Sequence, residues 1–367
     1  MQIGILKEPS DRRVALVPDI VKQLQDWNVK VMVEHDAGAA SAISDSDFKD
    51  SGAEIAERSV VLQNADMLIT ITPPSQEVYD LLKPQAVVIS SFEPFNRPEV
   101  VQELAQRQVT ALSLDMIPRI TLAQSMDVLS SMASIAGYKA VLLAADYLPR
   151  YFPMLTTAAG TIPPAKVLVL GAGVAGLQAI ATAKRIGGVV EAFDTRLAAK
   201  EEVESLGAKF VMVEGAQDDK EAGGYAVEQT EEYKQKQQQL IREKAEKADV
   251  IVTTAQLRGK PAPILVTAET VQKMKPGAVI VDLASSTGGN CELSEDQQVV
   301  EAHGVTIIGN SNLAQGVPMH ASQLFAKNIM NYLKVFVSEE GELNLDLENE
   351  ILKSSCIAHD GHAQYAQ

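Results

Sequence analysis

Three polar residues lie close together in the sequence and have the types and spacing to orient a ligand. The stretch RITLAQSMD, residues 119 to 127, contains Arg119, Gln124 and Asp127, and Ser130 follows it. A guanidinium, an amide and a carboxylate recognise polar groups through directed hydrogen bonds. The stretch contains no His, Cys or Lys, so nothing in it is suited to proton transfer near neutral pH or to nucleophilic attack. The pattern therefore indicates that a ligand is positioned here.

A glycine-rich motif further along the chain indicates what that ligand is. Gly171, Gly173 and Gly176 have GxGxxG spacing, follow the apolar run KVLVL and precede an Ala-rich helical stretch, and the next predicted strand ends at Asp194. This context is typical of dinucleotide binding. Gly171 would make the tight turn, Gly173 would let the pyrophosphate approach, and Gly176 would let the helix pack closely. The pyrophosphate would then lie at a helix N-terminus, where free N–H groups favour an anion.

The acidic residue after the second strand bears on the choice of nucleotide. Asp194 would accept hydrogen bonds from the ribose hydroxyls of NAD and repel the additional phosphate of NADP, whereas Arg196 could hold that phosphate. Because the carboxylate lies at the strand tip itself, we expect NAD. Two later strands, in VIVTTAQ and VIVDLASS, end at the same edge of the predicted sheet. Their ends place four residues near the nicotinamide side, although the last could equally cap the following turn: Thr253, Thr254, Ala255 and Asp282.

Composition excludes several classes of partner. The 367 residues include 32 Lys and Arg against 48 Asp and Glu, and the resulting net charge of −16 argues against nucleic acid and anionic lipid as ligands. Cys291 and Cys356 lie far apart, which indicates a reducing compartment and two inert thiols. The five histidines show no metal-ligand spacing, so no metal is expected. We see no signal peptide and no run approaching the roughly 18 apolar residues of a membrane helix. We therefore expect a soluble cytoplasmic chain without direct membrane insertion.

The positions of the predicted elements indicate two α/β domains. Strand-like runs at 2–6, 29–35, 65–71, 86–92 and 109–115 alternate with helical stretches, and a second series begins at 166–173 and ends at 305–310. This alternation of strands and helices predicts two doubly wound, Rossmann-like domains with a cleft between them. Two long predicted helices, 125–148 and 322–337, would cross between the domains. The first domain would then comprise 1–130 plus 320–367, and the NAD(H)-binding domain 131–319.

One charged, Gln-rich segment, residues 214–240, interrupts this rhythm. It has Gly223, Gly224 and Tyr225 near its centre. One interpretation is a solvated loop that leads into a surface helix. The other is a mobile lid in which the paired glycines form a hinge and Tyr225 moves onto the ligand. The residues alone leave both interpretations open.

Several stretches together resemble one known family. KEPSDRRVALVPD (7–19), PRITLAQSMDVLSS (118–131), TTAAGTIPPAKVLVLGAGVAGLQAIATAKR (156–185), AGGY (222–225) and GNCELS (289–294) are similar to the NAD(H)-binding soluble alpha subunit, or domain I, of proton-translocating NAD(P) transhydrogenases. These belong with alanine dehydrogenases to one family. The resemblance runs from Met1 to about Asp360. In many members membrane helices follow in the same chain, so the end at Gln367 suggests a system in which the soluble alpha subunit is a separate polypeptide.

The resemblance implies how such a chain is assembled. It implies a homodimer with NAD(H) on this chain, docked on membrane-embedded subunits that carry a proton channel and an NADP(H)-binding domain. The expected location is therefore cytoplasmic and peripheral to the inner (plasma) membrane through those partner subunits.

The resemblance also implies a role for each site residue. Arg119, Gln124 and Asp127 would position the nicotinamide without acting as general acid or base, since hydride transfer between two nicotinamides moves no proton at the reacting carbons. The residues expected to bind the cofactor are Ile120, Ser130, Gly171, Gly173, Val174, Gly176, Asp194, Thr195, Arg196, Gly224, Tyr225 and Ala255.

Two alternative functions share this fold. An alanine-type dehydrogenase requires proton transfers, and its cleft carries a lysine, a histidine and a second aspartate where this sequence has Thr72, Phe92 and Ser286. Arg13 matches the substrate-binding arginine of those enzymes, but without the acid–base set a structural role is favoured. A non-catalytic NAD sensor would need no catalytic group at all. Hydride exchange with a second nucleotide-binding protein separates that sensor from a transhydrogenase.

Overall fold

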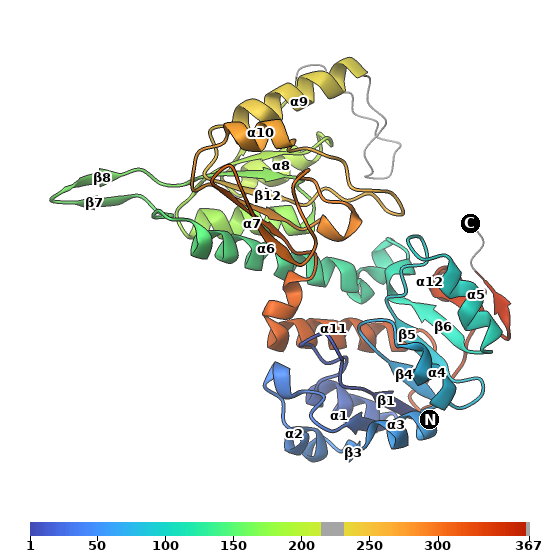
Figure 1. Cartoon of the computed structure of the whole chain (residues 1–367). Helices are drawn as coiled ribbons and strands as arrows, with labels where there is room; N and C mark the ends of the chain where they lie inside the picture. Colours follow the sequence, from blue (N-terminus) through green and yellow to red (C-terminus); the bar gives the residue numbers. More distant parts are fainter. Residues whose placement is uncertain (214–230, 365–367) are drawn as a thin grey trace. The chain divides into compact units, whose positions relative to one another are not determined.

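The structure divides the chain into two compact α/β units, each with its own sheet and core. It is a computed structural model that describes residues 1–213 and 231–364 (Figure 1). Unit 1 comprises Met1–Met132 and Gln315–Gln367, and unit 2 comprises Ala133–Ala314. The sequence analysis placed the breaks after residues 130 and 319. The structural division falls within helix α6 (Val128–Tyr147) and the short 3-10 helix η5 (Leu313–Gly316).

The sheet of unit 1 is doubly wound, as predicted. Its parallel strands have the spatial order β3-β2-β1-β4-β5-β6, and the chain's C-terminal part adds two antiparallel strands beside β6 that the sequence analysis did not predict. The three strands at its centre lie within predicted runs: β1 (Gln2–Ile5), β4 (Met67–Ile69) and β5 (Val87–Ser90). The others are β2 (Lys30–Glu34), β3 (Glu54–Ala56), β6 (Thr110–Ser113), β16 (Cys356–His359) and β17 (His362–Ala363).

Helices cover both faces of this sheet, because its central strands are apolar on both sides. One cluster joins Ile3 and Ile69 to Phe325 and Ile329 of α11, while Leu68 faces the opposite cluster with helices α3 and α5. The helical elements of unit 1 are α1 (Pro18–Asp26), η1 (Ala39–Ser41), α2 (Asp45–Asp50), α3 (Arg58–Asn64), α4 (Gln76–Leu81), α5 (Glu99–Gln106), η2 (Leu114–Met116), η3 (Thr121–Met126), α11 (Pro318–Leu333) and α12 (Glu350–Ser355).

Unit 2 repeats the same order of parallel strands. The spatial order of its parallel strands is β11-β10-β9-β12-β13-β15, so β9, the first of them in the chain, lies between β10 and β12. Strand β14 pairs antiparallel with β15 at the edge of the sheet. The strands are β9 (Lys166–Leu170), β10 (Val189–Phe193), β11 (Lys209–Phe210), β12 (Val250–Thr253), β13 (Val279–Asp282), β14 (Gln298–Ala302) and β15 (Val305–Gly309). Strand β14 was not predicted.

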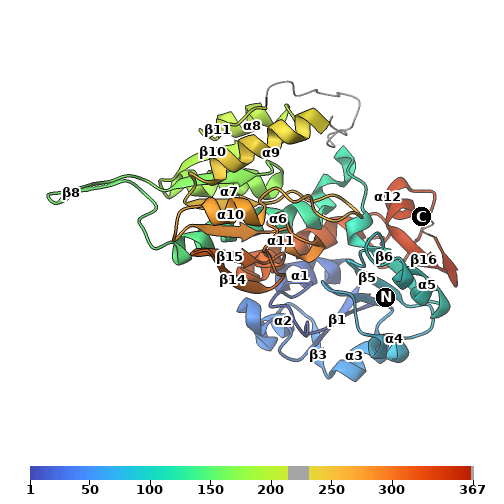
Figure 2. The same ribbon diagram turned by 45° about the horizontal axis from the view of Figure 1, so that its top comes forward.

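The helices of unit 2 form a layer on each face of its sheet (Figures 1 and 2). Helices α6, α7 and α8 share one apolar cluster, whereas α9 and α10 share the other. Their bounds are α7 (Val174–Arg185), α8 (Ala199–Ser205), η4 (Ser285–Thr287), α9 (Glu231–Ala245) and α10 (Ala268–Lys273). A separate exposed hairpin, β7 (Leu155–Thr157) and β8 (Gly160–Ile162), projects from the unit (Figures 1 and 2).

The two long helices differ from their predicted bounds. The predicted helix 125–148 is divided into η3 and α6, and α11 begins at Pro318 rather than 322, since proline is well suited to the first helical turn. Helix α6 also corrects the expectation about apolar runs. An 18-residue window of this 20-residue helix reaches a mean hydropathy of 1.5, so by length and composition alone the helix could cross a membrane. In the structure 39% of that window is buried, and Ile135 and Val141 are among its buried residues.

Candidate functional site

Two of the three motif glycines are required by close packing. Gly171 follows β9 with φ +101°, and a Cβ there would lie 2.5 Å from Thr254 Oγ1, which itself donates a hydrogen bond to the Gly171 carbonyl at 3.1 Å. A Cβ on Gly176, in the first turns of α7, would lie 1.9 Å from the same carbonyl oxygen. The turn is therefore pressed against both α7 and the end of β12, as the motif predicts.

Gly173 has a different environment. A Cβ added to it would meet nothing within 4 Å, although it forms the N-cap of the twelve-residue helix α7. The first N–H groups of a helix have no partner within the helix, and Gly173 has no side chain that could satisfy them. Val174, the next residue, is 45% exposed. An N-cap glycine with nothing within 4 Å of its Cβ position leaves room for a pyrophosphate at the helix N-terminus, so the residues present match the group that the motif implies.

Asp194 is held at the end of β10 by four hydrogen bonds. Its Oδ2 accepts from the Ala172 N–H (2.7 Å) and from Arg196 Nη2 (2.9 Å), and its Oδ1 accepts from Arg196 N (2.8 Å) and Nε (2.9 Å). Burial by itself would raise the pKa of this carboxyl, but the hydrogen bonds and charge of Arg196 hold it below its ordinary value. Asp194 is therefore an anion paired with Arg196, and a ribose hydroxyl must displace one of the arginine's bonds to reach it.

Asp282 stabilises a turn. Its fully buried carboxylate accepts hydrogen bonds from Thr253 Oγ1 (2.9 Å) and from the N–H groups of Ala284 (2.9 Å), Asn290 (2.8 Å) and Cys291 (3.0 Å). Thr253 ends β12 and Ala284 follows β13, whereas Asn290 and Cys291 lie in the loop after η4 of the same unit. Of the two roles left open by the sequence, the contacts favour the cap.

Asn290 holds a predicted site residue in place, and the sequence analysis did not select it. Its Oδ1 accepts the N–H of Ala255 at 2.9 Å, and its Nδ2 donates to the carbonyls of Ala255 and Pro263, both at 2.8 Å. The side chain thus fixes the backbone of Ala255, a predicted cofactor-binding residue, on both sides. The only signal in the sequence was its place in GNCELS, directly after two glycines.

The polar loop, residues 119–127, is partly buried and partly exposed within unit 1. Ala123 and Met126 belong to the core beside α11, whereas the side chains of Arg119 and Gln124 are exposed. Asp127 begins α6. Its Oδ1 accepts the Ser130 N–H at 2.9 Å and its Oδ2 the Ser130 hydroxyl at 2.6 Å, which is the geometry of a helix N-cap. Asp127 therefore has a structural role whatever else it does.

Two further predicted site residues lie in these same two regions. Ile120 is half-buried in the polar loop, and Thr195 is half-buried between Asp194 and Arg196. Gly224 and Tyr225, with most of the predicted lid, lie outside the described residues. The structure thus brings the glycine turn together with Asp194 in unit 2, and Asp127 together with Ser130 in unit 1.

The corresponding crevice of unit 1 is filled by one of its own side chains. In a doubly wound sheet a ligand binds beyond the strand ends where the strand order reverses, which here is between β1 and β4. Glu8 lies there, 7% exposed, and accepts hydrogen bonds from Ile71 N (2.6 Å) and from Thr72 Oγ1 (2.6 Å). Burial raises the pKa of Glu8, and these hydrogen bonds oppose the rise. Arg13 is ion-paired with Asp11, with 2.8 Å between Nε and Oδ1.

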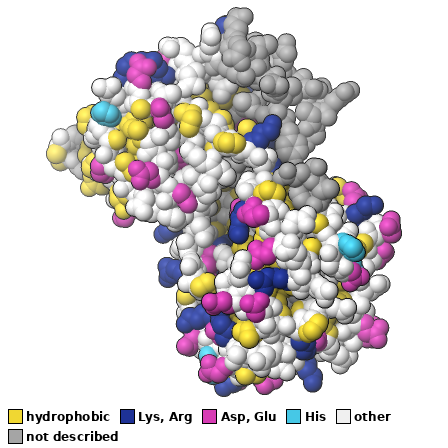
Figure 3. All heavy atoms as spheres, turned by 45° about the vertical axis from the view of Figure 1, so that its right-hand side comes forward, with side chains coloured by type: hydrophobic (Ala, Val, Ile, Leu, Met, Phe, Trp, Pro, Cys, Tyr) yellow, Lys and Arg dark blue, Asp and Glu magenta, His cyan; other side chains and the backbone are white. Residues whose placement is uncertain are grey.

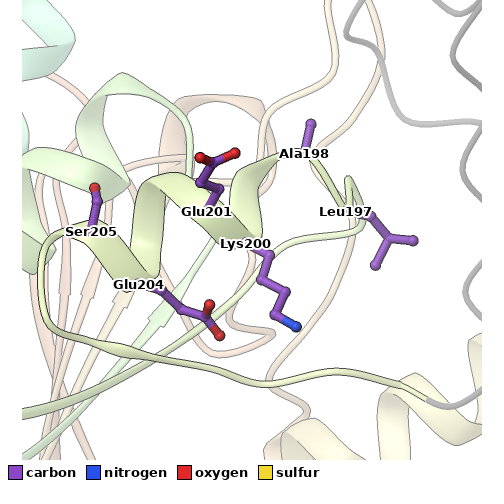
Figure 4. A pocket seen from close by; sticks show the side chains of 6 residues that line it. All are labelled: Leu197, Ala198, Lys200, Glu201, Glu204 and Ser205. Carbon is purple, nitrogen blue, oxygen red and sulfur yellow. The ribbon is translucent and has the colours of Figure 1, made fainter.

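Elsewhere, the described residues show a surface hollow, mixed surface charge and two thiols. The hollow in Figure 4 lies along α8, and its labelled side chains point outward in different directions. In Figure 3, basic and acidic side chains are interspersed on the face of unit 1 that is shown. Among the described residues, no group of three His, Cys, Asp or Glu could hold a metal ion. Both thiols are free and buried, and burial raises the pKa of Cys291 to about 12 and that of Cys356 to about 11.

Known proteins match the chain along its whole length. The family model "Alanine dehydrogenase/PNT, N-terminal domain" matches residues 4–136, and the C-terminal domain model of that family matches 140–366. An NAD(P) transhydrogenase alpha-subunit polypeptide of Rhodospirillum rubrum is 46% identical over 372 residues, covering 98% of this chain and 97% of that one. Alanine dehydrogenase of Bacillus subtilis is 26% identical over 378 residues, covering 100% and 93%. The crystal structure of transhydrogenase from Sinorhizobium meliloti superposes with a TM-score of 0.91 at 42% identity, covering 99% and 100%.

Proposed function

Because the chain belongs to the alanine dehydrogenase/PNT family, in which it is 46% identical to a transhydrogenase alpha subunit, we propose that it is the NAD(H)-binding component of a proton-translocating transhydrogenase. The observation that carries this proposal is the open space at Gly173 in front of the α7 N-terminus, next to the carboxylate of Asp194. A dinucleotide pyrophosphate is the anion that this arrangement suits.

Each residue then has a defined task in binding. The first N–H groups of α7 would hold the pyrophosphate, and Asp194 would bind the adenosine ribose after Arg196 releases one of its hydrogen bonds. Ala255, fixed by Asn290, would line the nicotinamide side. The further binding positions are those implied by the resemblance: Ile120, Ser130, Val174, Gly176, Thr195, Gly224 and Tyr225.

The polar loop would orient the nicotinamide. When bound, the dinucleotide supplies the hydride itself, so protein groups have only to align its ring. Gln124 offers an exposed amide, Arg119 an exposed cation, and Asp127 a carboxylate fixed by Ser130. With no general acid or base among them, the loop suits a reaction that needs alignment and no proton transfer.

The hydride acceptor would be NADP⁺ on a partner subunit. In this proposal membrane-embedded subunits carry the NADP(H)-binding domain and couple the transfer to proton translocation, which places the chain at the cytoplasmic surface of the inner membrane through protein contacts. The net charge of −16 supports attachment through partner subunits, because anionic lipid headgroups would repel it.

A homodimer is also included in the proposal. The hairpin β7–β8 projects from unit 2, and large apolar side chains are exposed on it and before it, with Met154 63% exposed and Tyr151 54% exposed. Apolar side chains gathered on a projecting element are typical of surfaces that bind another protein. A second copy of this chain is the partner that we propose for them.

Hydride exchange with an NADP(H)-binding partner tests the function. The chain is mixed with that partner, NADH and an NADP analogue, and reduction of the analogue is followed. We expect exchange that requires both proteins. NADH binding without exchange would support the sensor instead, and pyruvate-dependent oxidation of NADH in the presence of ammonium, without any partner, would support the alanine-type dehydrogenase.

A further inference from the structure

We propose that Asn328 and Asn331, on helix α11, are positioning residues that fix the polar loop for hydride transfer. The proposal rests on the proposed function, since it concerns how the loop that carries Gln124 and Asp127 is held. Neither asparagine belongs to the residues expected to touch the nucleotide.

Both side chains bind the same backbone atom. Nδ2 of Asn328 donates to the carbonyl oxygen of Ser125 at 2.8 Å, and Nδ2 of Asn331 donates to it at 3.2 Å. Residues three apart on a helix share a face, so the two amides reach the oxygen side by side. Lys334 Nζ donates to Oδ1 of Asn331 at 3.4 Å, which leaves the Nδ2 of that residue directed at the loop. The carbonyl of Ser125 therefore has a partner for each lone pair.

The loop benefits from such external support because it is not an α-helix. It forms the 3-10 helix η3, whose hydrogen-bond geometry is poorer than that of an α-helix. The bond from Asp127 N to Gln124 O is 3.3 Å long. Ala123, before Gln124, is buried in the core of unit 1, and Ser125, after Gln124, is held by the asparagines. Both neighbours of Gln124 are thus fixed while its own side chain stays exposed.

Stability alone does not explain Asn328. The residue is 7% exposed, and its Oδ1 is buried without a hydrogen-bond partner among the described residues, whereas the buried hydroxyls of Ser322 and Tyr332 on the same helix are both paired. A buried amide with an unsatisfied oxygen costs free energy of folding that an apolar residue of similar size would not. A residue type that lowers stability in its local environment is expected chiefly at functional sites. The gain that offsets this cost is the fixed position of the Ser125 carbonyl.

The test compares variants that remove or restore the amide donors. We expect the double variant Asn328→Leu/Asn331→Leu to lower the kcat of hydride transfer from NADH to an NADP analogue at least about tenfold, since a displacement of about 1 Å costs on the order of a hundredfold. The Kd for NADH and the melting temperature should be retained. The single variant Asn331→Leu should also lower kcat. Asn331→Gln keeps an amide donor at this position and should therefore retain most of the wild-type kcat.

A matched control is available in the same unit. Nδ2 of Asn64 donates to the carbonyl of Val60 at 2.8 Å on the exposed surface of α3, so Asn64→Leu removes the same kind of bond away from the loop and should leave kcat unchanged. Wild-type kcat in the double variant would overturn the proposal, and so would a loss of rate matched by equal losses in NADH affinity or melting temperature. Absence of hydride transfer in the wild-type chain would instead overturn the proposed function.

Discussion

The guanidinium of Arg196 and the carboxylate of Asp194 form a bidentate ion pair, with 2.9 Å between Nε and Oδ1 and 2.9 Å between Nη2 and Oδ2. The side chain of Asp194 is 7% exposed and that of Arg196 is 35% exposed. Arginine is therefore the member of the pair that is free to move toward solvent. Nucleotide choice then depends on which of the two residues the bound ribose engages.

We predict that the wild-type chain binds NADH more tightly than NADPH and that the ion pair sets the ratio. Arg196→Ala would leave the carboxylate without its cation, and the preference for NADH should increase. Asp194→Ala would leave the cation alone, and the preference should shift toward NADPH by about tenfold or more, because a charged hydrogen bond contributes about 1.5–3 kcal/mol. Calorimetric titration measures both affinities. Equal affinities in the wild-type chain would mean that Arg196 governs the site.

Substitution of two motif glycines should have different effects: one on NADH affinity and the other on the stability of the fold. Gly173→Ala adds a methyl group where nothing lies within 4 Å, so the melting temperature should be retained while NADH affinity falls. Gly176→Ala adds it 1.9 Å from the Gly171 carbonyl, so the free energy of unfolding should fall by at least about 2 kcal/mol. Thermal melts and NADH titrations of both variants test this. NADH affinity that is unchanged in Gly173→Ala would place the pyrophosphate elsewhere.

Gln124→Asn should slow hydride transfer without weakening NADH binding. Most of the affinity is expected from the adenosine and pyrophosphate contacts in unit 2, whereas a shift of about 1 Å at the ring costs on the order of a hundredfold in rate. Single-turnover transfer with the partner and a separate NADH titration give the two quantities. Gln124 would be an ordinary binding contact if affinity and rate fell together.

Asp249 should contribute stability that depends on pH. Its side chain, 4% exposed, accepts hydrogen bonds from Arg150 and Lys275, both at 2.8 Å. Burial alone would raise the pKa of this carboxyl, but Lys275, the Lys166 N–H and Arg150 hold it below the ordinary 3.8. A lowered folded-state pKa gives stability that is present above the unfolded-state pKa and is lost as pH falls through the folded-state value.

The free energy of unfolding at acidic pH therefore tests these ion pairs. Asp249→Asn should lower the free energy of unfolding at neutral pH, and the difference from the wild-type chain should shrink below about pH 4. Urea denaturation across that range measures it. A difference that is independent of pH would assign the loss to packing.

The sequence predicted most of what depends on local pattern. Continuous apolar runs marked β9, β12 and β13, and the fixed glycine spacing marked the turn before α7, because each of these signals is complete within a few residues. Strand β14 was missed because its five residues neither alternate regularly nor form a continuous apolar run, and they are largely exposed at the edge, where they pair with β15. Strand β16 pairs with β6, which lies far away in the sequence, so the residues near β16 contain no pattern that predicts it.

The site shows the same limit. Asp194 and Arg196 were both selected, yet their ion pair depends on side-chain geometry that the sequence does not contain. The role of Asp282 stayed open until the N–H groups of Asn290 and Cys291 were seen to reach its carboxylate. Asn328 gave no signal at all, since its partner Ser125 lies in a loop that only the fold brings to α11.

Glu8 has a consequence for binding stoichiometry. The chain contains two sheets with the strand order of nucleotide-binding folds, so counting folds alone would suggest two dinucleotides per chain. In unit 1, however, the carboxylate of Glu8 takes the backbone N–H of Ile71 and the hydroxyl of Thr72 at the very crevice that a ligand would use. The buried side chain of Glu8 therefore already occupies that place. Saturation should therefore be reached at one nucleotide per polypeptide.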